Sequence, residues 1–292
     1  MHQDMFGVKR YKVGLHIHTT NSDGKVSPEE SAKIYKEAGF DIIAHTDHWF
    51  YHGEETLAGL KVISGCEYNT GASDTAVDVM HIVGVGMKYD PKLDRKTATR
   101  QDVIDGIRAA GGMAILAHPA WSLNTPAHAL ALKGFEAMEI YNTVSDEGQS
   151  SRPYSGYFTD LLANEGVAYP QIATDDTHYY HGIDDCRSYI MVDAESDASE
   201  HILQAVREGR FYATQGPEIH LRREENKIVV DCSPCVKIAV FSNASWAPNR
   251  VRKGEGLTRL EYSLHACDKW VRAEVKDEAG NEAWSNVLFI ND

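Results

Sequence analysis

Two histidines near the amino terminus have a spacing that suits metal binding. His16 and His18 are separated by one residue at the end of a short apolar run that is typical of a strand. Successive side chains of a strand point to opposite faces, so both imidazoles project from one face and can bind the same cation. Asp23 follows on a segment where Ser22 and Gly24 favour a turn, close enough to serve a neighbouring ion. Such a pair alone is equally compatible with a structural role.

Further histidines and carboxylates are placed in the same way along the chain. They are His48 in Thr46-Asp47-His48, Glu67, His81, His118, and Asp176 with His178. Most of them close a short apolar run, as expected where strands deliver side chains to one rim of a barrel. Asp175 is an alternative to Asp176, but the spacing of two residues to His178 on an extended segment favours Asp176. Imidazoles and carboxylates repeated at strand ends predict a site for metal cations.

Strands and helices alternate in the part of the chain that carries these residues. Ser27, Pro28 and Glu30 predict the start of a helix, with Ser27 as its cap, and Gly39 ends it. After the first strand, apolar runs predict strands at 40–45, 60–65, 79–85, 113–117, 137–141 and 171–174. Further helices are predicted at 99–110, 154–164 and 198–208. This alternation predicts a parallel barrel of seven βα units, one fewer than the usual eight.

The pattern changes near Gly216. Short alternating segments such as 227–230, 236–240 and 270–275 follow, separated by turn residues, and they predict a small antiparallel β-sandwich. We therefore expect a barrel domain at 1–215 and a sandwich domain at 216–292. Cys232-Ser-Pro-Cys235 has the spacing of a metal-binding or redox pair, but it has no second pair, so we interpret it as two strand residues around a turn.

Composition limits the function classes. The formal charge of −14 and the absence of a basic run argue against nucleic acid as an obligate partner. The five cysteines are odd in number and scattered, which favours a reducing compartment over a disulfide framework. No leader-like or membrane-length apolar segment occurs, so we expect a soluble, cytoplasmic protein that does not bind membranes. The sequence does not predict an oligomeric state.

The ordered set of motifs resembles the PHP superfamily, the polymerase and histidinol phosphatase domain. The nine matching positions are His16, His18, Asp23, His48, Glu67, His81, His118, Asp176 and His178. The resemblance implies a distorted (β/α)7 PHP barrel that holds two or three divalent ions, typically Zn, Mn or Fe. By analogy, the first ion is held by His16, His18, Glu67 and Asp176, the second by Glu67, His81 and His118, and the third by Asp23, His48 and His178. Glu67 then bridges the first two ions.

The resemblance also implies an activity. It predicts a metal-dependent phosphoesterase that hydrolyses a small phosphorylated metabolite with a metal-bound hydroxide. Glu67, Asp176 and His178 are the predicted catalytic residues. The predicted substrate contacts are Arg187, His181 and Asn142, with a surface role as the alternative for each.

Two other functions stay open at this point. The predicted C-terminal sandwich is similar in arrangement to the carbaryl-hydrolase-like branch, which suggests hydrolysis of a carbamate or a carboxylic ester. A non-catalytic, metal-stabilised interaction module ranks last, because such modules usually lack several ligands and this sequence has the complete set.

Overall fold

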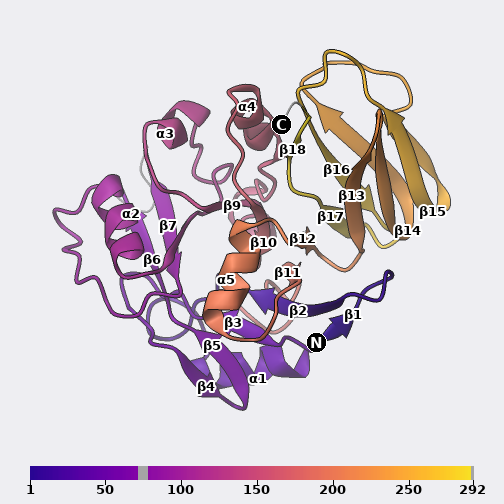
Figure 1. Cartoon of the computed structure of the whole chain (residues 1–292). Helices are drawn as coiled ribbons and strands as arrows, with labels where there is room; N and C mark the ends of the chain where they lie inside the picture. The colour runs from indigo at the N-terminus through magenta and orange to yellow at the C-terminus, as the bar shows by residue number, and fades with distance from the viewer. Residues whose placement is uncertain (72–77, 291–292) are drawn as a thin grey trace.

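The computed structural model describes residues 1–71 and 78–290, whose strands form a 13-stranded and a 5-stranded sheet (Figure 1). Over these residues the helices are α1 (Pro28–Glu37), α2 (Arg100–Ala109), α3 (Pro126–Leu130), α4 (Gly156–Asn164), α5 (Ser199–Arg207) and the π-helix η1 (Asp146–Ser150). The strands up to residue 214 are β1 (His2–Gln3), β2 (Lys9–Gly14), β3 (Ile42–Ala44), β4 (Glu55–Leu57), β5 (Leu60–Ile63), β6 (Gly65–Thr70), β7 (Met80–Val85), β8 (Met113–Leu116), β9 (Ala137–Asn142), β10 (Gln171–Thr174), β11 (Tyr189–Val192) and β12 (Phe211–Thr214). The later strands are β13 (Ile219–Glu224), β14 (Lys227–Ser242), β15 (Val251–Ser263), β16 (Trp270–Lys276), β17 (Glu282–Trp284) and β18 (Leu288–Phe289).

The smaller sheet has the strand order β10-β9-β8-β7-β6. Its strands β10, β9 and β8 are parallel, whereas β7 is antiparallel to both β8 and β6. Strands that follow one another in the chain can pair directly in the antiparallel sense without a crossover helix. The prediction of an all-parallel sheet is therefore wrong at β7, because an apolar run does not specify the direction of its strand.

The larger sheet contains the parallel strands β2, β3 and β5, next to β11, which is antiparallel to β2. Isolated bridges connect the two sheets, one between Ile17 and Thr177 and one between His48 and Glu67. These single bridges do not close the sheets, so the fold is mixed α/β rather than the predicted closed (β/α)7 barrel. The short β3 and β10, with 3 and 4 residues, leave little length for a continuous ladder at these positions.

One apolar core lies between the two sheets. Val13 of β2, Ile115 of β8 and Ile190 of β11 belong to this fully buried cluster, and Ile202 and Val206 of α5 join it. Helix α1 begins as predicted, because the Ser27 side chain accepts the amide hydrogen of Glu30 at 3.2 Å. The core gives the strand ends a rigid base. Among the described residues, no helix has the length and apolar character that spanning a membrane requires.

The C-terminal strands are antiparallel, as predicted, and pack around a second apolar core that includes Ile228, Val240 and Val271. They stand together to one side, in orange to yellow in Figure 1, but β17 pairs with β12, so the larger sheet continues across the expected boundary at residue 215. The division into 1–215 and 216–292 stays a prediction.

The segment Cys232-Ser-Pro-Cys235 lies within the single strand β14, so the predicted turn is wrong. The register of β14 against β15 shifts there, and such a bulge accommodates a proline inside a strand.

Candidate metal centre

The motif histidines at the end of β2 meet the motif residues at the end of β10. The amide of His18 donates to the carbonyl of Thr177 at 3.0 Å, and the amide of Asp176 donates to the carbonyl of His16 at 2.9 Å. This short parallel register aligns two segments that each carry ligand side chains at alternate positions. His16, His18, Asp176 and His178 are therefore brought to one place, although about 160 residues separate the two motifs in the sequence.

Glu67, His81 and His118 come from the smaller sheet, to which β10 also belongs. Glu67 lies on β6, where its amide donates to the carbonyl of Thr46 at 3.1 Å and the bridge to His48 forms. His81 lies on the neighbouring β7, and His118 follows β8 directly. His81 and His118 thus lie near strand ends, as predicted, whereas Glu67 lies within its strand.

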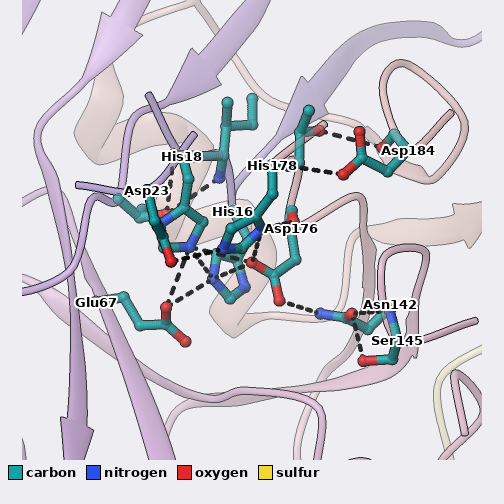
Figure 2. A network of polar contacts seen from close by, with 12 residues as sticks. His16, His18, Asp23, Glu67, Asn142, Ser145, Asp176, His178 and Asp184 are labelled. Carbon is teal, nitrogen blue, oxygen red and sulfur yellow. Dashed lines mark hydrogen bonds and ion pairs between the residues drawn. The ribbon is translucent and has the colours of Figure 1, made fainter. Parts of the chain in front are cut away.

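Four side chains of the cluster form a compact group (Figure 2). His16 Nε2 lies 3.2 Å from His18 Nε2, 3.3 Å from Glu67 Oε2 and 3.1 Å from Asp176 Oδ1. His18 Nε2 lies 3.1 Å from each of the same two carboxylate oxygens. Ligands about 2.0–2.1 Å from a tetrahedral ion are about 3.3 Å apart, so these spacings match the edges of one coordination sphere.

Two further groups share members with the first. Glu67 Oε1 lies 2.9 Å from His81 Nδ1 and 3.4 Å from His118 Nε2, which makes the second group. The third group consists of His18, Asp23, His48 and His178. Its Asp23 Oδ2 lies 3.4 Å from His178 Nε2 and 3.7 Å from His48 Nε2, and the Asp23 side chain is 52% exposed. The geometry thus brings all nine predicted ligands together, with Glu67 common to two groups and His18 common to two.

The ring nitrogens show which atoms are left for a ligand. Nδ1 of His16 contacts Glu139 at 2.7 Å, Nδ1 of His118 contacts Ser122 at 3.1 Å, and Nδ1 of His178 contacts the carbonyl of Asp176 at 2.7 Å. In each ring, Nε2 is then the atom that faces the cluster. A histidine that binds a metal almost always donates its other ring hydrogen to such an acceptor.

Several buried polar atoms of the cluster have no hydrogen-bond partner. They are Asp176 Oδ1, His48 Nδ1 and His81 Nε2. His48 Nδ1 lies only 3.0 Å from Glu67 Oε2, but without hydrogen-bond geometry. Leaving buried polar groups unpaired costs free energy, and one such atom belongs to a residue of each of the three groups, which fits sites for cations. The mixture of imidazoles and carboxylates suits divalent ions of the transition series.

Burial and charge shift the pKa values in the cluster. Burial alone lowers the pKa of His18, but hydrogen bonds and charge interactions with Asp176 and Glu67 raise it to about 10. Burial likewise opposes the charged form of Glu67, yet the charges of His16 and His81 hold its pKa well below the ordinary value. In the absence of cations, protons on the imidazoles therefore balance the carboxylates, and a cation must displace those protons.

Two buried carboxylates outside the ligand set hold the segments that carry ligands. Asp47 accepts the amide of Thr19 at 2.8 Å and the hydroxyl of Ser22 at 2.6 Å, which fixes the turn before Asp23. Asp184 accepts the amide of His178 at 2.7 Å (Figure 2). Neither role could be predicted from the sequence, because each depends on hydrogen bonds that form only after the turns have folded.

The predicted substrate contacts do not line the cavity at the cluster. Asn142 is fully buried behind the cluster, where its amide donates to Asp176 at 3.1 Å and its oxygen accepts from Ser145 (Figure 2). Arg187 and His181 are exposed and lie outside the lining. The lining consists of seven predicted ligands together with Trp121 and Gln149, which the sequence analysis missed, and it encloses about 160 Å³.

A larger cavity of about 500 Å³ lies elsewhere, between β12, β13 and the segment 285–288. Three of its arginines have acidic partners, such as Asp4 for Arg10 at 2.7 Å and Glu224 for Arg222 at 2.9 Å, and Arg223 donates to backbone carbonyls. None of the three His, Asp and Glu groups in the described residues includes a residue of this lining. The smaller cavity is therefore the candidate site.

No protein-family model matches the chain, and no curated protein matches it. A solved structure decides the fold: a two-domain protein from Bacteroides vulgatus that contains a predicted PHP-like metal-dependent phosphoesterase matches 98% of this chain and 96% of its own, with a TM-score of 0.54 and 16% identity. This chain has a PHP-like fold. The resemblance predicted from the motifs is thereby confirmed at the level of the fold.

Weaker similarities extend to two other solved structures. The lesion-specific endonuclease Q from Pyrococcus furiosus matches 68% of this chain and 56% of its own, with a TM-score of 0.47 and 14% identity. An amidohydrolase from Chromobacterium violaceum with bound sulfate matches 59% of this chain and 89% of its own, with a TM-score of 0.41 and 16% identity.

Proposed function

We propose that this protein is a metal-dependent hydrolase that cleaves a phosphate ester of a small molecule. The observation that carries the proposal is the first group, in which two imidazole nitrogens and two carboxylate oxygens stand 3.1–3.3 Å apart. Buried polar atoms without partners at the same place support it.

The three groups would hold two or three divalent ions, of which Zn, Mn and Fe suit the ligand types. Such ions lower the pKa of water and polarise the oxygens of an ester. Glu67 joins the first two groups and would fix their separation. The third group includes the half-exposed Asp23, so we expect its ion to bind most weakly.

The charge of the chain's own residues supports a phosphorylated substrate. The ligand carboxylates Asp23, Glu67 and Asp176 do not neutralise three divalent ions, so the loaded cavity would attract an anion despite the acidic chain. The cavity is small, which favours a small substrate, and Trp121 and Gln149 offer the wall against which the leaving group would lie. The prediction that nucleic acid is not a partner remains part of this proposal.

A carbamate or carboxylic ester is the second candidate. Among the described residues that line the cavity there is no lysine or arginine. The protein itself therefore offers no positive side chain for a phosphate group, and a neutral ester or carbamate would leave no such side chain without a partner.

The deciding experiment compares hydrolysis of aryl phosphate, bis-aryl phosphate, aryl carboxylic ester and aryl carbamate by protein loaded with Zn, Mn or Fe. We expect the phosphate monoester to give the highest kcat/KM. A higher kcat/KM for the ester or the carbamate would replace the first candidate by the second, and cleavage of abasic-site DNA would contradict the exclusion of nucleic acid.

A further inference from the structure

Glu139 is a buried carboxylate in the middle of β9 that the proposed reaction does not use directly. Its side chain is 1% exposed and lies beside the cluster. It accepts hydrogen bonds from His16 Nδ1 at 2.7 Å, Thr174 Oγ1 at 2.7 Å, the amide of His118 at 2.8 Å and Asn142 Nδ2 at 2.8 Å. Every donor is a neighbour of the metal cluster or part of it.

Three of these hydrogen bonds reach predicted metal ligands. The bond to His16 orients the ring, and the bond to the amide of His118 holds a residue whose backbone has the unusual φ of 26°. The bond to Asn142 continues to Asp176, because the same amide nitrogen lies 3.1 Å from Asp176 Oδ2. One carboxylate therefore connects ligands that come from β2, β8 and β10.

The contact with His16 also decides where the ring carries its proton. A carboxylate accepts a hydrogen only if Nδ1 bears it, which leaves the lone pair of Nε2 for a cation. Nε2 is the atom that lies 3.1–3.3 Å from His18, Glu67 and Asp176. The observed geometry thus agrees with one tautomer of His16.

We propose that Glu139 is a positioning residue of the metal centre, which selects the Nδ1-protonated form of His16 and sets the placement of His118 and Asp176. The proposal rests on the proposed metal-binding function. It goes beyond that function because it assigns the arrangement of three ligands to a residue that binds no metal itself.

The variant Glu139→Gln tests this role with a nearly unchanged shape. If the NH₂ group of the new glutamine faces His118 and Asn142, it is a hydrogen-bond donor placed against two other donors. If it faces His16 instead, it forces the proton onto Nε2, which then cannot bind a cation. Because either orientation disturbs the first group, we expect Zn²⁺ and Co²⁺ to bind 10–100-fold more weakly, as is typical for such supporting residues, and the visible Co²⁺ absorption to change.

The matched control is Thr174→Val, which removes one hydrogen bond to the same carboxylate but keeps its charge. We expect this variant to bind Zn²⁺ with less than a threefold change. Equal Zn²⁺ affinity and an equal Co²⁺ spectrum for wild type and Glu139→Gln would overturn the proposal.

A measurement on the wild-type protein covers the case in which Glu139→Gln fails to fold. Long-range ¹H–¹⁵N spectra of the Zn-loaded protein report the tautomer of each histidine, and we expect His16 to carry its proton on Nδ1. A proton on Nε2 would overturn the proposal. None of these readouts needs turnover, so a wild-type protein that binds Zn²⁺ but hydrolyses no ester would contradict the proposed function and leave the role of Glu139 standing.

Discussion

Two places in this molecule bury several charged groups, and they treat those charges differently. Near the C-terminal strands, the side chain of Arg272 is 1% exposed and its guanidinium donates to Asp160 at 2.6 Å and 3.0 Å. It also contacts Glu274 and lies 4.2 Å from the ring centre of Phe241. The protein itself satisfies this buried cation, as is usual for a structural ion pair.

In the candidate metal centre, by contrast, charged and polar side chains lie close together, and several of their atoms have no hydrogen-bond partner. Asp176 Oδ1 and His81 Nε2 are buried and unpaired, and Glu67 faces several histidines at once. The difference teaches that buried charge alone does not indicate a functional site, whereas buried charge with unused lone pairs indicates a candidate cation site. The predictions below test this contrast.

The largest effect is expected from Glu67→Gln, which alters two of the three groups. Loss of several kcal/mol of stabilisation of the transition state corresponds to a fall in kcat/KM on the order of 10³-fold. Metal content per protein, measured by mass spectrometry, should fall in parallel, while the metal-free protein should melt no lower than the metal-free wild type. The control is Glu274→Gln, where a partly buried carboxylate outside the cluster is changed and turnover per folded molecule should persist.

Arg272→Met should affect stability and leave the chemistry intact. Removing the guanidinium leaves two partly buried carboxylates without a cationic partner. We therefore expect the free energy of unfolding to fall by about 3 kcal/mol in urea denaturation. The control Lys227→Met breaks the exposed pair with Glu261 and should leave the free energy of unfolding nearly unchanged. If Arg272→Met abolished metal binding in the folded protein, the contrast between the two places would be wrong.

The cluster should also couple metal binding to pH. His18 has a raised pKa of about 10 in the metal-free protein, so its contribution to folding is fully present below pH 6.5 and is lost as pH rises towards 10. A cation must displace that proton, so its affinity should rise over the same range. Titration calorimetry with Zn²⁺ in buffers of different ionisation enthalpy would measure the released protons. Zn²⁺ affinity that is flat from pH 6 to 9 would contradict this prediction.

The smallest effect is expected at the wall of the cavity. The ring of Trp121 lies 4.9 Å from that of His118 and 5.5 Å from that of His81. If the leaving group lies against Trp121, Trp121→Ala should raise KM for aryl phosphates about fivefold, since a ring contact is worth about 1 kcal/mol. Trp121→Phe should keep most of the affinity, and KM for alkyl phosphates should change little in both variants. An equal rise for aryl and alkyl substrates would remove Trp121 from the leaving-group site.

Much of the site was predictable because its residues have distinctive types at strand ends. His16 and Asp176 each follow an apolar run, and their spacings to His18 and His178 reveal the shared face. Glu139 was less accessible to sequence reasoning, although a carboxylate inside an apolar strand was a usable signal. The sequence around Trp121 and Gln149 contains no comparable signal, because these residues reach the cavity only through the tertiary contacts of their segments.

The fold was predictable in its elements and less so in their connections. The apolar runs at β7 and β8 indicated strands, but the sequence did not reveal that these two pair in the antiparallel sense. The β12–β17 pairing was likewise hidden, since cross-strand partners far apart in the chain leave no local pattern.

That pairing has a consequence for how the molecule comes apart. Cutting the chain after residue 215 would expose the backbone of β12 where Ala213 and Thr214 now face Trp284 and Ala283, and a bare strand of this kind recruits other chains. The last quarter of the polypeptide thus covers an otherwise open strand edge of the part that carries the cluster. Calorimetry should accordingly record a single melting transition for the whole protein, and the isolated segment 1–215 should aggregate.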